Sequence, residues 1–170
     1  MVNQLGNYSL YIALLISIFI IIKTSLSFRN SSNVLSGNIF SLISVQSLMV
    51  IISFLTLIYA FVTSDFSNET VYNNSHTTKP LFYKISGTWG NHEGSLLLWL
   101  LVLTIFLFLF TIDSKNLSQR YRTLTLFFQE IIIFGFLLFI LFTSNPFANI
   151  FPIPSEGTGL NPIPVSYTHL

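Results

Sequence analysis

Long apolar stretches separated by short polar ones dominate the chain. Four stand out, at about residues 5–22, 39–62, 96–112 and 124–143. Each has 17–24 residues, enough for a helix to cross a hydrocarbon core of about 30 Å. Of the 13 charged residues, 12 lie outside these stretches, so the stretches lack the polar face of a soluble surface helix. They also lack the alternation over about 10 residues that marks membrane barrel strands. The pattern predicts an all-α, polytopic membrane helix bundle with four transmembrane helices.

Composition supports this fold class and excludes several functions. Apolar residues make up 52% and charged residues 8% of the 170-residue chain, whereas soluble domains average roughly 25% charged. Seven Lys and Arg residues in separate connections form no basic stripe, so we expect no nucleic-acid partner. With zero Cys, the chain has no disulfide, thiolate metal site or cysteine nucleophile.

Basic residues set the expected orientation. The connection after the first apolar stretch holds Lys23 and Arg29 without an acid, and the one after the third holds three basic residues against Asp113. The positive-inside rule places both connections in the cytoplasm or the mitochondrial matrix. The N-terminus, the loop 63–95 and the Pro-rich tail from residue 144 then face outward. We expect a multi-pass protein of the bacterial inner membrane with a periplasmic N-terminus; the alternative is the mitochondrial inner membrane.

The densest cluster of special residues lies where the outer loop enters the third apolar stretch. It comprises Trp89, Gly90, Asn91, His92, Glu93, Gly94 and, further on, Trp99. A helix beginning near Asn91 would use that side chain as a cap, and His92 and Trp99 would share one stripe with Leu96 and Leu103. Such an aromatic stripe beside a histidine would suit a planar macrocycle. The other interpretation is a tryptophan anchor at the membrane boundary together with a helix cap.

Glu130 is the only charged residue inside an apolar stretch. From the edge of that stretch we expect it about 9 Å deep, where an unpaired carboxylate costs several kcal/mol. It is therefore either a proton or ligand site facing the bundle, or a structural group bonded to a neighbouring helix. The three His residues have no helical metal-ligand spacing. The residues alone predict no metal site, no catalytic residue and no reaction.

Two segments resemble one known family. The string NSHTTKPLFYKISGTWGNHEGSLLLW at residues 74–99 and the tail residues NPF at 145–147, Pro152, Pro154, EG at 156–157 and GLNP at 159–162 are similar to the CcmF family. That family is the haem-lyase subunit of the cytochrome c maturation system. The resemblance identifies residues 1–162 as the N-terminal membrane portion of a CcmF-like protein. Residues 163–170 depart from the family, and we expect a truncation or an artefact there.

The resemblance implies a function in cytochrome c biogenesis. Proteins of this family take haem from a membrane haem chaperone on the outer face and help attach it to apocytochrome c, alongside other membrane subunits of the system. The cofactor would be haem, with its ligands outside this chain, and residues 89–94 and Trp99 would contribute to the haem or chaperone surface. A chain of this extent alone is expected to be inactive. Two alternatives stay open: a membrane assembly subunit without haem chemistry, and a transporter fragment using Glu130.

Overall fold

The computed structural model describes residues 2–30, 37–114 and 117–159. These residues form six helices and no extended strand, apart from an isolated bridge between Asn68 and Asn149. The helices are α1 (Val2–Asn30), α2 (Gly37–Thr63), α3 (Glu69–Asn74), α4 (Leu81–Gly87), α5 (His92–Asp113) and α6 (Gln119–Phe142). Four of them, α1, α2, α5 and α6, are long and apolar enough to span a membrane. The predicted all-α bundle with four spans is confirmed.

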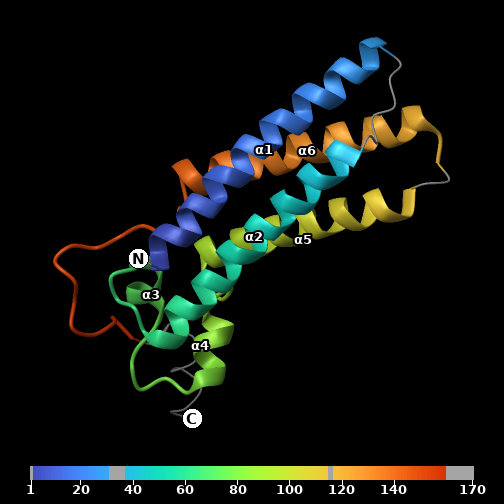
Figure 1. Cartoon of the computed structure of the whole chain (residues 1–170). Helices are drawn as coiled ribbons and strands as arrows, with labels where there is room; N and C mark the ends of the chain where they lie inside the picture. Colours follow the sequence, from blue (N-terminus) through green and yellow to red (C-terminus); the bar gives the residue numbers. More distant parts are fainter. Residues whose placement is uncertain (1, 31–36, 115–116, 160–170) are drawn as a thin grey trace.

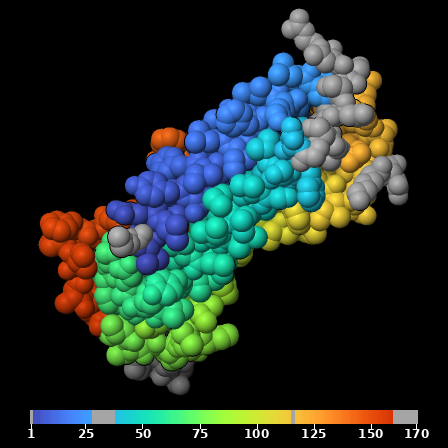
Figure 2. Space-filling view, in the orientation of Figure 1, coloured from blue at the N-terminus to red at the C-terminus, as the bar shows by residue number. Residues whose placement is uncertain are grey.

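The four long helices form a bundle in which α1 packs against α2 and α6, and α5 packs against the same two helices. This places α2 and α6 diagonally across from each other. Figure 1 shows the resulting rod, with the N-terminus, the short helices α3 and α4 and the tail together at one end. The space-filling view in Figure 2 shows this end as the broad one, where the tail covers the side of the green loop region. The segments predicted to face outward therefore share one end of the bundle.

Each long helix extends beyond the apolar stretch that predicted it. The third begins at His92 rather than residue 96, and the fourth at Gln119 rather than residue 124. The first, expected to end at residue 22, continues to Asn30. Only the middle of a spanning helix must be apolar, so its polar ends continue the helix past the hydrocarbon core.

Hydroxyl side chains inside the long helices are mostly accommodated by their own backbone. The hydroxyl of Thr24 donates to the carbonyl of Ile20 at 2.8 Å, and that of Thr56 donates to the carbonyl of Ile52 at 2.7 Å. Thr111 bonds in the same way with the carbonyl of Phe108. Because these donors find acceptors within their own helix, they can be buried in a membrane bundle at little cost.

Asn68 joins the three segments of the outer end. Its side chain caps α3 by accepting from the Val71 amide at 3.1 Å. It also donates to the Asn3 side chain of α1 at 3.1 Å and to the Pro146 carbonyl of the tail at 2.9 Å. The ring of Phe147 is buried against Gly6, which leaves no room for a side chain there. The Pro-rich tail packs in an irregular conformation on α1 and the outer loop.

Candidate functional site

The turn between α4 and α5 carries most of the predicted candidate surface. Helix α4 ends at Gly87, and α5 begins at His92 with Asn91 as its N-cap. The Asn91 side chain accepts from the Gly94 amide at 2.7 Å and donates to the carbonyl of Gly87 at 2.8 Å. One side chain therefore satisfies a free amide of α5 and a free carbonyl of α4. The cap expected for a helix that begins near Asn91 is therefore present.

The glycines of this turn have different structural roles. The position of a Gly94 side chain is already occupied by the backbone carbonyl of Thr88, so only glycine fits there. At Gly90 a side chain would first meet the Ser86 carbonyl oxygen at 3.4 Å, which is an ordinary contact. The close approach at Gly94 therefore sets the angle at which the turn enters the membrane helix.

The aromatic and imidazole side chains of the segment face away from the bundle. Trp89 and His92 are exposed, and the indole of Trp99, about two turns further along α5, is 64% exposed. Leu96 and Leu103, which complete the predicted stripe, are partly buried. The structure therefore places Trp89 and His92 at the outer end of the bundle. Trp99 lies further along α5, on the side of that helix that faces away from the other helices.

Glu93 belongs to a different surface. With Glu69 of α3, it lines a hollow of about 310 Å³ at the outer end of α6, together with Ser144 and Asn145 of the tail. This hollow is polar and bears two carboxyl groups. It is therefore unsuited to an apolar macrocycle, which apolar walls would enclose.

The described residues do not by themselves form a haem pocket. They supply one exposed imidazole and two exposed indoles, which are a face for stacking and not an enclosed cleft. Among the described residues, no three His, Cys, Asp or Glu side chains group as a metal site would require.

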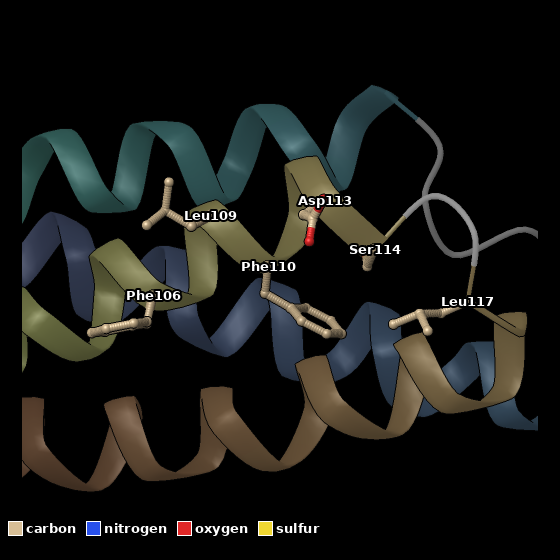
Figure 3. A pocket seen from close by; sticks show the side chains of 6 residues that line it. All are labelled: Phe106, Leu109, Phe110, Asp113, Ser114 and Leu117. Atoms are coloured by element: carbon tan, nitrogen blue, oxygen red, sulfur yellow. The ribbon is translucent and has the colours of Figure 1, made fainter.

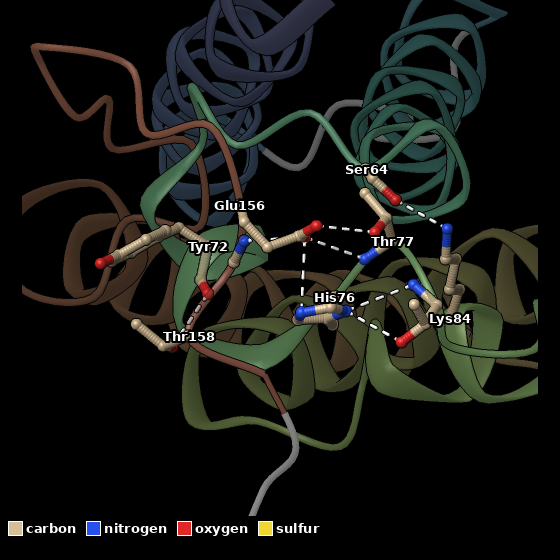
Figure 4. A network of polar contacts seen from close by, with 9 residues as sticks. Ser64, Tyr72, His76, Thr77, Lys84, Glu156 and Thr158 are labelled. Carbon is tan, nitrogen blue, oxygen red and sulfur yellow. Dashed lines mark hydrogen bonds and ion pairs between the residues drawn. The ribbon is translucent and has the colours of Figure 1, made fainter.

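A polar network fastens the tail to the outer loop (Figure 4). The Glu156 carboxylate accepts from the Thr77 hydroxyl at 2.7 Å and from the Thr77 amide at 3.0 Å, and the His76 ring lies 3.9 Å away. Thr158 donates to the Tyr72 carbonyl through both its amide and its hydroxyl. The bond from the Thr77 hydroxyl is the main cause that lowers the pKa of Glu156 from its ordinary value. The carboxylate is thus the preferred form when the tail is docked.

Glu130 is fully buried, near the middle of its helix. It stands eleven residues after Gln119 and twelve before Phe142. The Gln46 amide of α2 donates to its carboxyl group at 2.6 Å. The Ser17 hydroxyl of α1 lies next to this group. Three buried polar atoms meet here without a hydrogen-bond partner among the described residues. They are the Ser17 hydroxyl oxygen, the second carboxyl oxygen of Glu130 and the amide oxygen of Gln46.

The sequence interpretation named Glu130 but not its partner. Gln46 was detectable, as the only amide side chain within the apolar stretch 39–62. What the sequence lacked was the rotation of α2 and α6, which decides whether the two groups meet. Ser17 carried no such signal, because serine is common in these helices.

The fold and the outer segment together define a polytopic helical membrane protein with an ordered outer end that carries exposed aromatic residues and a histidine. The chain is similar to several known membrane proteins of one family. The chain is 44% identical to the cytochrome c-type biogenesis protein CycK of Rhizobium meliloti over 163 residues, 96% of the chain. It is 38% identical to CcmF of Haemophilus influenzae over 171 residues, again 96% of the chain. A solved structure of the cytochrome c haem lyase CcmF matches 86% of the chain with a TM-score of 0.80 and 26% sequence identity.

The chain belongs to the CcmF family of cytochrome c-type biogenesis proteins. It spans about a quarter of the length of these relatives: 24% of CycK, 25% of CcmF from Haemophilus influenzae and 25% of the solved chain. No protein-family model matches it. The expected family, fold class and membrane character are thereby confirmed. The ending 163–170, expected to be a truncation or an artefact, lies outside the described residues.

Proposed function

We propose that the chain acts in cytochrome c biogenesis as part of a haem lyase of the bacterial inner membrane, with its outer end on the periplasmic side. In this proposal Trp89 and His92 contribute to the surface that receives haem, or the chaperone carrying it, before haem is attached to apocytochrome c. They do not form the axial ligand site, since one imidazole cannot supply two ligands. Other membrane subunits of the maturation system would contact the same assembly.

The exposure of Trp89 and His92 on a rigid turn is the observation that supports this assignment. Asn91 and Gly94 fix the turn through the cap and the close carbonyl contact. The turn therefore fixes the backbone positions of Trp89 and His92, and the described residues leave both side chains exposed. Indole rings can stack on a porphyrin plane, and the free amides at the start of α5 favour a propionate or another acidic group.

The test compares surface and structural changes in a strain whose only copy of the protein carries the variant. Trp89→Ala and His92→Ala should reduce the yield of mature cytochrome c and the capture of the haem chaperone, while the protein accumulates at its normal level. Tyr8→Ala is the matched control, because Tyr8 is an exposed aromatic residue on α1 outside this turn. If both turn variants mature cytochrome c like the wild type, the turn serves only as a membrane anchor and helix cap.

A further inference from the structure

Three polar side chains meet in the interior of the bundle, away from the outer turn. This central polar cluster consists of Ser17 of α1, Gln46 of α2 and Glu130 of α6, and each of the three residues is 0% exposed. The Gln46 amide nitrogen donates to one carboxyl oxygen of Glu130 at 2.6 Å. The Ser17 hydroxyl lies beside the same carboxyl group. The cluster therefore joins three of the four spanning helices.

The cluster is short of one hydrogen-bond donor when Glu130 is ionised. The Ser17 hydroxyl oxygen, the second Glu130 oxygen and the Gln46 amide oxygen have no partner among the described residues. A carboxylate only accepts hydrogen bonds, whereas a hydroxyl group donates one. Ser17 can therefore donate to Glu130 or to Gln46, but not to both. The oxygen left over stays unpaired in the bundle interior, where that is costly.

A proton on Glu130 supplies the missing donor. The second carboxyl oxygen can then donate to Ser17, and the Ser17 hydroxyl can donate to the Gln46 amide oxygen. Together with the bond from Gln46 to Glu130, these bonds close a cycle in which each residue donates once and accepts once. The cycle requires the Ser17 side chain to turn toward the other two, since its present orientation makes neither bond.

The helices around the cluster provide no opposite charge that would favour the carboxylate. Helix α2 contains no Asp, Glu, Lys, Arg or His residue. On α1, Lys23 stands six residues after Ser17 and is exposed. On α6, Arg122 stands eight residues before Glu130, which is about 12 Å along the helix axis. The other ionisable residues of these three helices stand at least six residues along their helix from the cluster member: Tyr8, Tyr11, Arg29, Tyr59, Arg120 and Tyr121.

The ionisable residues of α5 lie at its two ends. The Gln129 side chain, next to Glu130 in the sequence, donates to the Leu103 carbonyl at 3.3 Å, which marks the level of Glu130 on α5. Asp113 follows Leu103 by ten residues and lines an open hollow of about 550 Å³ at the end of α5 (Figure 3). His92 and Glu93 are the first two residues of the helix. None of these side chains is at the level of the cluster.

We propose that the central polar cluster is a proton-binding site, in which Glu130 is un-ionised at neutral pH and donates its proton to a hydrogen bond with Ser17. The proton is taken up from water as the helices pack. It spares the bundle an uncompensated carboxylate at depth and gives each unpaired oxygen a partner. The site is independent of the proposed haem or chaperone surface, because it depends only on groups buried inside the four-helix bundle.

Infrared spectroscopy of the whole chain in lipid bilayers at neutral pH tests the proposal. The carbonyl stretch of an un-ionised carboxylic acid is separate from the carboxylate bands, and it shifts to lower frequency in deuterated water. We expect the wild type to show this acid band. Glu130→Gln should remove the band and leave the carboxylate bands unchanged. Loss of carboxylate intensity in Glu130→Gln would show that Glu130 is ionised, and this result would overturn the proposal.

Two serine variants that keep Glu130 test the hydrogen-bonded cycle. Ser17→Ala removes the acceptor of the acid proton, so the acid band should shift to higher frequency. Ser53→Ala is the matched control: Ser53 is also a fully buried hydroxyl without a partner among the described residues, but it stands seven residues after Gln46 on α2. It should leave the band unchanged. The proposal is overturned if the wild type lacks the acid band, if the band persists in Glu130→Gln, or if the two serine variants behave alike.

Discussion

The Gln46 amide of α2 and the Glu130 carboxyl group of α6 meet at 2.6 Å between helices that stand diagonally across the bundle. Both residues are fully buried. A polar bond in the middle of an apolar bundle fixes the relative rotation and depth of the two helices, because any shift leaves both groups without a partner. The pair therefore specifies how the four spans assemble, whether or not Glu130 also takes part in function.

Replacing Glu130 with Leu should destabilise the bundle. The change leaves the Gln46 amide buried without its acceptor, which costs about 1–3 kcal/mol. Glu130→Gln should cost less, because a carbonyl oxygen remains available to accept the bond. Phe128→Leu, on an exposed position of the same helix, should have little effect. Unfolding of the purified chain by a denaturing detergent gives the three values, and equal stability of Glu130→Leu and the wild type would contradict the structural role.

Gly94→Ala should disrupt the turn before α5, whereas Gly90→Ala should be tolerated. The added methyl group at position 94 collides with the Thr88 carbonyl, and at position 90 it has room. We expect a destabilisation of about 1–3 kcal/mol for Gly94→Ala, as for other overpacked sites, and less than 1 kcal/mol for Gly90→Ala. Thermal unfolding measures both. In cells, Gly94→Ala should also lower the cytochrome c yield, and similar behaviour of the two variants would mean that the turn can relax.

The orientation can be tested directly, because the chain has zero native Cys residues. Asn73→Cys and Arg120→Cys place single thiols on exposed positions at opposite ends of the bundle. A membrane-impermeant maleimide added to spheroplasts should label Asn73→Cys at once and Arg120→Cys only after the membrane is opened. This follows from the excess of basic residues at the Arg120 end. The reverse labelling order would place the candidate surface in the cytoplasm and remove the proposed function.

The spans were predictable because uninterrupted apolar length is a local property of the sequence. The cap at Asn91 was predictable for the same reason, since it depends on residues within one turn. Asn68 marks the start of α3 by the same capping signal, but α3 and α4 have only 6 and 7 residues. Helices that short are stabilised by tertiary contacts and not by their own propensity.

The site was less predictable because its geometry depends on long-range contacts. Glycine is required at position 94 because the Thr88 carbonyl, six residues earlier, occupies the place of a side chain. The hydrogen-bond partner of Glu130, Gln46, is 84 residues away in the sequence. Each of these features follows from the relative placement of helices, on which hydrophobic periodicity alone gives no information.

The Glu156 network should make docking of the tail sensitive to acid. The folded pKa of Glu156 is lowered from its ordinary value of 4.5, mainly by the Thr77 hydroxyl bond. A lowered folded pKa means that docking is stabilised above pH 4.5 and that this stabilisation is lost as the pH falls through the folded pKa. Hydrogen exchange at the Thr77 amide, which donates to Glu156 at 3.0 Å, measures docking after correction for the intrinsic exchange rate. Wild-type protection should be high at neutral pH and fall below the ordinary pKa.

Glu156→Gln should lower protection at neutral pH and make it independent of pH, because the amide is a weaker acceptor that does not titrate. His76→Gln separates the remaining contribution: it keeps the carboxylate and the Thr77 bonds, so most of the acid sensitivity should persist. If His76→Gln abolishes that sensitivity, the 3.9 Å ion pair controls docking instead of the Thr77 bonds.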